Sequence, residues 1–291
     1  MRIRKAVLPV AGLGTRVLPA SKVIPKELLP LVDKPTLQYI VEEAVDAGIE
    51  EIILVTSRSK RSIEDHFDVF PELEQALERK GKRKELEELR HTQQMAKYSA
   101  VRQAEALGLG HAILCAKELV GDEPFVVLLG DNLIAEEMPC LPRMIELYEQ
   151  YNATILSLFT VPEEQISAYG IVAIESISAD AVKVTQMVEK PPRDEAPSNL
   201  AVYGHYIMTP DIFELIEKTP PGKGGEIWVT DALDTQARNG RCYGLRLQEG
   251  SIYDTGTPLG LLTTSISLAL KRPELAPALR DFMRQALKEE K

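Results

Sequence analysis

The chain has 291 residues, of which 44% are apolar and 27% are charged, and its formal net charge is −10. This balance is ordinary for a folded globular protein, and an acidic chain is a poor general binder of nucleic acid or of anionic membranes. No run of 18 apolar residues occurs, and the first residues do not follow the pattern of a signal peptide. We therefore expect a cytoplasmic protein with neither nucleic acid nor a membrane as partner.

Short apolar runs alternate with a helical pattern along the first half of the chain. Strands are expected at 5–10, 50–57 and 124–132, and an amphipathic helix is expected at 35–48, where apolar residues recur with a period near 3.6. Near-continuous apolar strands that alternate with helices are typical of a doubly wound sheet with helices on both faces. The sequence thus predicts an α/β protein with a Rossmann-like, mixed but mainly parallel sheet.

The second half of the chain is richer in strand patterns. Strands are expected at 153–161, 170–175, 181–189 and 199–208, and some of them are expected to be antiparallel. Between the early strands, residues 72–90 are nearly all Glu, Lys, Arg and Leu, which predicts an exposed helix.

The tail at 273–291 also has a helical pattern. One stripe of this helix would be apolar, with Leu275, Leu279, Phe282, Met283 and Leu287. Packing against its own domain is the favoured interpretation of this stripe, and a contact between subunits is the alternative.

A loop rich in glycine and cations follows the first predicted strand, in "GLGTRVLPASKVIPK" at 12–26. Gly12 and Gly14 would let the backbone approach a ligand closely, and the cations would suit a polyphosphate. A dinucleotide-binding loop would need a third glycine at the position of Val17, and the P-loop pattern GxxxxGK[ST] does not occur. Ligands of open α/β sheets bind at the carboxyl ends of strands, where this loop begins.

The cysteines and histidines follow no pattern that indicates a metal site or a nucleophile. The three cysteines have no CxxC spacing, so neither a zinc site nor a disulfide framework is expected. His111, close to a second glycine-rich segment, is expected to make a structural hydrogen bond.

The segment "GLGTRVLPASKVIPKELLPLVDKP" closely resembles the signature of the bacterial UTP–glucose-1-phosphate uridylyltransferases, which are sugar-nucleotide pyrophosphorylases of the nucleotidyltransferase family. The resemblance continues in order through "VRQAEALGLGHAILCA", "AYGIV", "VEKP", "TPPGKGGEIWVTDAL" and "YDTGTPLG". It implies transfer of a uridylyl group from UTP to glucose 1-phosphate, which yields UDP-glucose and pyrophosphate. It also implies Mg²⁺ as cofactor, ordered binding with the nucleotide first, and a homo-oligomer, either a dimer or a tetramer.

The resemblance assigns roles to charged residues from distant segments. Lys26 would stabilise charge at the α-phosphate, Arg16 would face the leaving pyrophosphate, and Lys190 would hold the sugar phosphate. Asp131, which ends an apolar strand, and Asp254, which precedes a turn, would hold the metal. Two carboxylates together with phosphate oxygens suit Mg²⁺.

The resemblance also implies contacts with the nucleotide. Gln103 would read the edge of uracil, because its amide offers both a donor and an acceptor. Glu27 would reach the ribose hydroxyls, and the backbone would contact the nucleotide at Ala11, Gly12, Gly14 and Gly108.

The sugar contacts implied by the resemblance are at Gly170, Glu189, Lys190 and Gly204. Glu189 would accept hydrogen bonds from the sugar hydroxyls. Adjacent side chains of a strand point to opposite faces, so Glu189 and Lys190 can both serve only if the strand ends there.

One nucleotidyltransferase domain over 1–291 is implied, with a nucleotide-binding half at 1–133, a sugar-phosphate-binding half at 134–260 and C-terminal helices at 261–291. Three alternatives stay open at this point: a sibling enzyme such as a thymidylyltransferase, a homologue without activity, and a nicotinamide dehydrogenase. The last is disfavoured by Val17 and by Lys26 in the loop.

Overall fold

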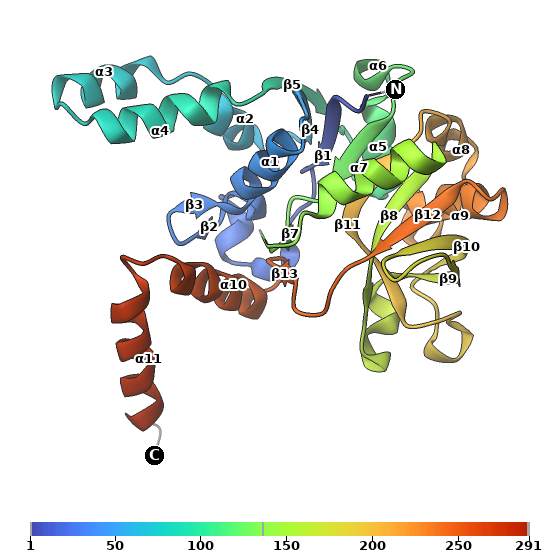
Figure 1. Ribbon diagram of the computed structural model, residues 1–291. Coiled ribbons are helices and arrows are strands. Elements are labelled where there is room, and N and C mark those ends of the chain that lie inside the picture. Colours follow the sequence, from blue (N-terminus) through green and yellow to red (C-terminus); the bar gives the residue numbers. More distant parts are fainter. Residues whose placement is uncertain (1, 136, 290–291) are drawn as a thin grey trace.

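The computed structural model describes residues 2–135 and 137–289. A nine-stranded sheet crosses the molecule in the order β5-β4-β1-β6-β11-β8-β12-β10-β9 (Figure 1). Its strands point in one direction except β10 and β11, which confirms the mixed but mainly parallel sheet. The strands are β1 (Lys5–Pro9), β4 (Glu51–Thr56), β5 (Lys97–Arg102), β6 (Phe125–Leu128), β8 (Thr154–Thr160), β9 (Gly170–Ser176), β10 (Ala181–Glu189), β11 (Leu200–Met208) and β12 (Cys242–Arg246).

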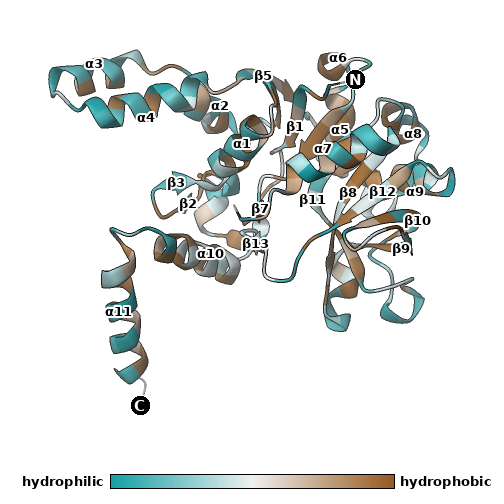
Figure 2. Cartoon of the chain, viewed as in Figure 1, coloured by the Kyte–Doolittle hydropathy of each residue, from teal (hydrophilic) through white to brown (hydrophobic). Residues whose placement is uncertain are grey.

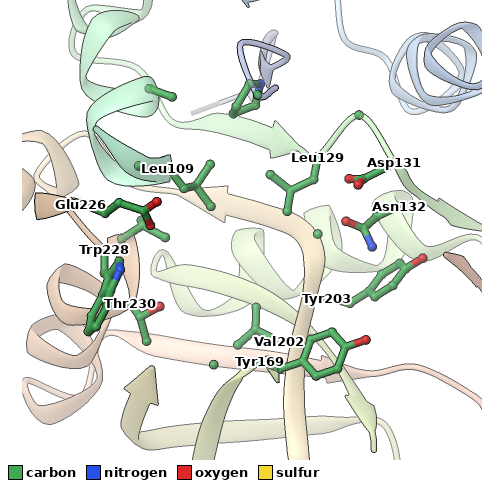
Figure 3. A pocket seen from close by; sticks show the side chains of 18 of the residues that line it. Leu109, Leu129, Asp131, Asn132, Tyr169, Val202, Tyr203, Glu226, Trp228 and Thr230 are labelled. Atoms are coloured by element: carbon green, nitrogen blue, oxygen red, sulfur yellow. The ribbon is translucent and has the colours of Figure 1, made fainter. Parts of the chain in front are cut away.

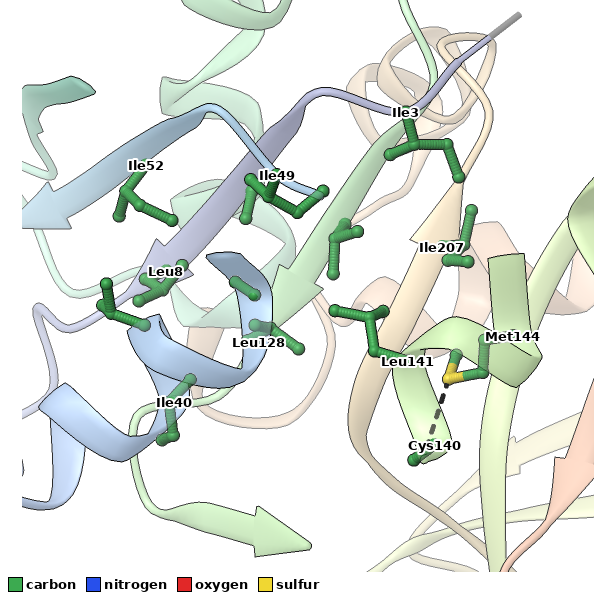
Figure 4. Close-up of a cluster of buried hydrophobic side chains, with 14 of the residues drawn as sticks. Ile3, Leu8, Ile40, Ile49, Ile52, Leu128, Cys140, Leu141, Met144 and Ile207 are labelled. Carbon is green, nitrogen blue, oxygen red and sulfur yellow. Dashed lines mark hydrogen bonds between the residues drawn. The ribbon is translucent and has the colours of Figure 1, made fainter. Parts of the chain in front are cut away.

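Side chains alternate between two apolar cores along the parallel strands. Leu8 of β1 and Leu54 of β4 lie in one core, whereas their neighbours Val7 and Ile53 lie in the other. The helices of the first core, part of which Figure 4 shows, are α1 (Thr36–Asp46) and α7 (Cys140–Tyr151); those of the second are α5 (Gly108–Cys115), α8 (Ile212–Lys218) and α9 (Val229–Arg238). Helices therefore cover both faces of the sheet, as predicted for a doubly wound fold.

Most predicted strands lie in place, with ends that differ by one residue at most, but the strand predicted at 124–132 is too long. β6 stops at Leu128 because the chain then turns: Leu129 N–H donates to Gly204 O, at 2.9 Å, and Asn132 N–H donates to Leu129 O, at 3.2 Å. Asp131 therefore lies in a turn before β7 (Asn132–Ile134), and not at the end of a strand.

The helix predicted at 72–90 is a pair of helices, α3 (Pro71–Arg79) and α4 (Arg83–Gln94), which form an arm beyond α2 (Arg61–Phe67) (Figure 1). The helical segment is divided because Gly81 adopts a φ of 67°, a left-handed conformation that ends α3. Arg90 of α4 then pairs with Glu74 and Glu78 of α3, at 2.8 and 2.7 Å.

Two short antiparallel ladders and several single turns complete the fold. β7 pairs with β13 (Ile252–Asp254), and this register places Asp254 opposite Asn132. The remaining elements are β2 (Pro30–Leu31), β3 (Lys34–Pro35), α6 (Lys117–Val120) and the 3-10 turns Thr15–Val17, Ala20–Lys22, Lys26–Leu28, Glu163–Ala168, Arg193–Glu195 and Lys223–Gly225.

The chain ends in α10 (Pro258–Lys271) and α11 (Ala276–Glu289). α11 points away from the sheet (Figure 1), and apolar residues line part of its length (Figure 2). Phe282 and Leu287 are each 66% exposed, so the expected packing of this stripe against its own domain is wrong for these two side chains. No helix among residues 2–135 and 137–289 is long and apolar enough to cross a membrane.

Candidate active site

A cleft of about 640 Å³ lies at the carboxyl ends of β1, β5 and β6 and extends to β9, β10 and β11. Figure 3 shows that its side chains come from both halves of the chain. Nearly all the predicted site residues line it: Ala11, Gly12, Gly14, Arg16, Lys26, Gln103, Gly108, Asp131, Gly170, Glu189, Lys190, Gly204 and Asp254. A polar cleft at this edge is where an open α/β sheet binds its ligands.

The loop after β1 brings two cations to one carboxylate. Gly14 adopts a φ of 66°, and its carbonyl accepts a hydrogen bond from Ser21 Oγ at 2.7 Å, so the loop folds back on itself. Lys26 Nζ donates to Asp131 Oδ2, and Arg16 Nη2 lies 3.6 Å from the same oxygen. The side chains of Lys26 and Asp131 are both largely buried, whereas that of Arg16 is 63% exposed.

Asp131 and Asp254 are neighbours, as the sequence predicts. The ladder of β7 and β13 sets Asp254 beside the turn that holds Asp131, and Thr255 donates to Asp131 O from its N–H at 3.0 Å and from its hydroxyl at 2.9 Å. A methyl carbon placed on Gly256 would lie 2.8 Å from Asp131 Oδ2 and 3.0 Å from Asp254 Oδ1. Both carboxylates therefore border the same small space, which glycine leaves open.

The loop after β5 presents an amide to the cleft. Gln103 Nε2 donates to Gly108 O at 3.1 Å and lies 3.1 Å from His111 Nδ1, which is the structural hydrogen bond expected of His111. The protein therefore supplies partners for the amide nitrogen of a glutamine that lines the cleft. Gly108 has a φ of 89°, and a β-carbon there would meet Glu226 Cβ at 2.9 Å, so only glycine fits without strain.

The far wall of the cleft holds a carboxylate and an amine in adjacent positions. β10 ends at Glu189, and Lys190 then adopts a φ of 44°, so both side chains line the cleft. The strand therefore ends at Glu189, as it must if both side chains are to face the same ligand. Thr230 donates from its hydroxyl to Glu189 Oε2 at 2.5 Å, and Lys190 Nζ lies 3.3 Å from Glu189 Oε1. Gly170, opposite Glu189 in the β9–β10 pairing, leaves room for this carboxylate.

Gly204 lies in the cleft wall where β11 changes register between Val202 and Tyr206. A β-carbon on Gly204 would lie 2.5 Å from Asn132 Oδ1. The glycine therefore makes space for the side chain of Asn132, whatever contact its backbone makes with a ligand.

Glu27 is the one predicted nucleotide residue whose side chain the structure turns away from the cleft. It is 1% exposed, and its carboxylate accepts a hydrogen bond from Lys60 Nζ at 2.7 Å. Burial raises the pKa of the Glu27 carboxyl, and the Lys60 and Lys26 ammonium groups oppose this shift. The geometry does not support a contact with the ribose hydroxyls, because the ion pair keeps this carboxylate beneath the cleft.

Sequence reasoning missed several residues of the cleft. Tyr203 is buried, its hydroxyl lies 3.0 Å from Leu133 O and from Tyr253 O, and burial raises the pKa of its phenol. Trp228 and Thr230 also line the cleft. Their motif, "EIWVTDAL", is part of the family resemblance, but the residues of an extended segment that leads into a helix do not indicate which side chains face a ligand.

The segment that carries Trp228 is hydrogen-bonded both to the loop that contains Gly108 and to Glu189 on the far wall of the cleft. Ile227 N–H donates to Leu107 O at 2.8 Å, and Gly110 N–H donates to Ile227 O at 2.9 Å. Three residues later, Thr230 holds Glu189.

Known proteins resemble this chain over almost its whole length. A family model described as nucleotidyl transferase matches residues 5–269. A UTP–glucose-1-phosphate uridylyltransferase of Bacillus subtilis is 48% identical over 289 residues, which are 99% of either chain. One of Staphylococcus epidermidis is 46% identical over 98% of either chain.

Solved structures agree with these relatives. A structure described as UTP-bound UGPase from Acinetobacter baumannii is 42% identical, with a TM-score of 0.89, and the match covers 97% of this chain and 99% of that chain. A UDP-glucose pyrophosphorylase complexed with UDP-glucose is 44% identical, with a TM-score of 0.84, over 93% of this chain and 100% of that chain.

A doubly wound sheet whose carboxyl edge gathers cations and paired carboxylates defines an enzyme that handles phosphate groups. The chain belongs to the nucleotidyl transferase family, within its branch of UTP–glucose-1-phosphate uridylyltransferases. The family and the fold class that the sequence predicts are confirmed.

Replacement of Gly256 by alanine tests the space between the carboxylates. Its methyl group would enter the volume that Asp131, Asp254 and Arg16 border, at 3.0 Å or less from each. We expect Gly256→Ala to lower kcat by about 10²-fold with little change in melting temperature, because a small displacement of reacting groups suffices for such a loss. Unchanged steady-state turnover would show that this space is not used.

Proposed function

We propose that the chain transfers a uridylyl group from UTP to glucose 1-phosphate. A phosphate oxygen of glucose 1-phosphate attacks the α-phosphorus, the bond to the β-phosphate oxygen breaks, and its electron pair leaves with pyrophosphate. The convergence of Lys26, Arg16, Asp131 and Asp254 on one point of the cleft supports this reaction most directly. Two similar solved structures add support, because one contains UTP, a substrate of this reaction, and the other contains UDP-glucose, its product.

The cations supply what phosphoryl transfer chiefly needs, which is positioning and neutralisation of charge. Lys26 is largely buried beside Asp131, and we assign its ammonium group to the charge that develops on the α-phosphate. Arg16 is more exposed, which suits a group that follows the departing pyrophosphate. Lys190, at the opposite wall, holds the phosphate of the attacking sugar.

Mg²⁺ is the cofactor that this site fits. Its candidate donors are carboxylate oxygens, which Mg²⁺ prefers. In residues 2–135 and 137–289, no three or more His, Cys, Asp or Glu side chains form a metal site, so the substrate and water would have to supply the other ligands. Asp131 and Asp254 would hold the ion, and phosphate oxygens and water would complete its coordination. The bound ion would neutralise phosphate charge and orient the α-phosphate.

Recognition of the two substrates divides between the halves of the domain. We assign uracil to the amide of Gln103 and the backbone of Gly108 in 1–133, with further backbone contacts at Ala11, Gly12 and Gly14. The second half, 134–260, receives glucose 1-phosphate through Gly170, Glu189, Lys190 and Gly204. Because both substrates are multiply charged phosphates that do not cross membranes unaided, we place the reaction in the cytoplasm.

The proposed reaction is tested by pyrophosphate release with a panel of nucleoside triphosphates and sugar 1-phosphates. We expect UTP with glucose 1-phosphate to give the highest kcat/KM. Chelation of divalent ions should abolish turnover, and added Mg²⁺ should restore it, because the ion would neutralise the charge of the phosphates and orient them. A higher kcat/KM with dTTP would identify a thymidylyltransferase instead, and the absence of turnover with every pair would contradict an enzymatic role.

Glu189 is expected to serve the sugar alone. Glu189→Gln keeps the size of the side chain and the bond from Thr230 but removes the charge that accepts from the sugar hydroxyls. We expect KM for glucose 1-phosphate to rise by roughly 10- to 100-fold, as for loss of one charged hydrogen bond, and KM for UTP to change little. Equal increases for both substrates in initial-rate measurements would contradict this assignment.

We also propose that the protein is a homo-oligomer, a dimer or a tetramer, assembled through α11. The exposed apolar stripe with Phe282 and Leu287 has no cover within the described residues of its own chain, and burial against a second copy would remove it from water.

The double variant Phe282→Glu/Leu287→Glu is expected to lower the mass measured by sedimentation equilibrium to that of one chain, 32.3 kDa. Gln285→Glu, which adds a charge outside the stripe, is the matched control and should leave the oligomer intact. A double variant that keeps the wild-type mass would exclude this interface.

A further inference from the structure

A buried tyrosine joins the short β7–β13 ladder to the main sheet. Tyr203 of β11 is 3% exposed, and its hydroxyl lies 3.0 Å from Leu133 O of β7 and 3.0 Å from Tyr253 O of β13. Both partners are carbonyl oxygens, which can only accept, so the hydroxyl donates and its one proton is shared between them. One side chain of the sheet thus holds both strands of the ladder.

The two carbonyl groups belong to residues that face each other in the ladder and lie close in sequence to the carboxylates of the cleft. Leu133 is paired with Tyr253, and Asn132 is paired with Asp254. Tyr253 directly precedes Asp254, and Leu133 follows Asp131 by two residues. A displacement of one strand against the other is therefore passed to the two carboxylates over one or two residues.

The ladder depends on additional hydrogen bonds because it is short. Each strand has three residues, and an isolated pair of strands is only marginally stable in water. Thr255 donates to Asp131 O at one end of the ladder, and Ala135 N–H donates to Ser251 O, at 2.7 Å, at the other end. These bonds join the two segments to each other, whereas the Tyr203 hydroxyl also joins them to β11.

The ring of Tyr203 is itself held by two other aromatic rings. Phe159 of β8 packs edge-on against it, with the ring centroids 5.4 Å apart, and the ring of His205 lies nearly parallel to it at 6.0 Å. His205 is fully buried, and its Nε2 lies 3.0 Å from Glu43 Oε2 of α1. Packing therefore fixes the position from which the Tyr203 hydroxyl reaches the ladder.

We infer that Tyr203 is a positioning residue for the metal-binding carboxylates: its hydroxyl holds β7 and β13 so that Asp131 and Asp254 stay within reach of one ion. The inference rests on the proposed function, because it concerns the two residues assigned to Mg²⁺. Tyr203 lines the cleft (Figure 3), but its hydroxyl proton is engaged by the two carbonyl groups, so it acts through the ladder. Groups that orient the ligands of a metal typically contribute about 10- to 100-fold to metal affinity or activity.

Tyr203→Phe removes the hydroxyl and keeps the ring. Mn²⁺, which also prefers oxygen ligands, serves as the probe of the Mg²⁺ site. In the complex with UDP-glucose, we expect the dissociation constant of Mn²⁺ to rise by about 10-fold, because the carboxylates are no longer held together. Electron paramagnetic resonance of free Mn²⁺, with UDP-glucose alone as the blank, measures this constant without turnover. In initial-rate assays, the Mg²⁺ concentration for half-maximal rate should rise by a similar factor, while KM for glucose 1-phosphate changes little.

Tyr98→Phe is the matched control, because it removes a phenol hydroxyl that donates to a backbone carbonyl elsewhere in the fold. The Tyr98 hydroxyl lies 3.2 Å from Thr92 O, and Tyr98 does not line the cleft. This variant should bind Mn²⁺ with the wild-type dissociation constant. Incorporation of 4-aminophenylalanine in place of Tyr203 restores a donor to the two carbonyl groups and should recover most of the lost affinity.

A merely structural hydroxyl predicts another pattern. Tyr203→Phe would then lower the melting temperature and leave the dissociation constant of Mn²⁺ unchanged, and this result would overturn the inference. If Tyr203→Phe does not fold, Tyr203→Met, which fills the space of the ring with a flexible apolar chain, is measured in its place with the same two outcomes.

Failure of the proposed function gives a result of its own. A wild-type chain that transfers no uridylyl group, or that binds no Mn²⁺ beside UDP-glucose, would contradict the proposed function itself. An active wild type that binds Mn²⁺ no better than the Tyr203→Phe variant would contradict only the positioning role.

Discussion

Two carboxylates and two cations share one small volume at the carboxyl edge of the sheet. The rest of the site depends on the balance of these four charges. Asp131 and Asp254 would repel each other if they stood alone. Lys26 and Arg16 lie against Asp131 and offset that repulsion in the absence of a ligand. A polyphosphate with a divalent ion carries both signs of charge. Its phosphates can therefore pair with the two cations while its metal ion pairs with the two carboxylates, so that no charge is left uncompensated.

The fold delivers these groups from positions far apart in sequence. Parallel strands end at one edge of the sheet, so the loops after β1 and β6 meet there. The pairing of β13 with β7 then brings Asp254 beside the turn that holds Asp131. β10 ends at Glu189, which turns Lys190 toward the cleft from the other wall. The rigid elements thus fix the distances, and Gly256 keeps the space between Asp131, Asp254 and Arg16 open.

The sequence predicted the strands well because their apolar runs are long and their burial is nearly complete. It predicted the meeting of Asp131 and Asp254 only through a family resemblance, since no local pattern reveals a ladder between residues 132 and 254. The burial of Glu27 was not predicted for a related reason: it depends on Lys60, which is remote in sequence. The break at Gly81 was missed because a charged helical pattern continues on both sides of it.

Trp228 is the single tryptophan of the chain, and it lies in the cleft wall between the loop of Gly108 and the hydroxyl that holds Glu189. Indole emission from this protein therefore comes from one place only. The molecule therefore carries a built-in optical reporter in the cleft wall, and a ligand that binds beside the indole is expected to change its emission without any attached dye.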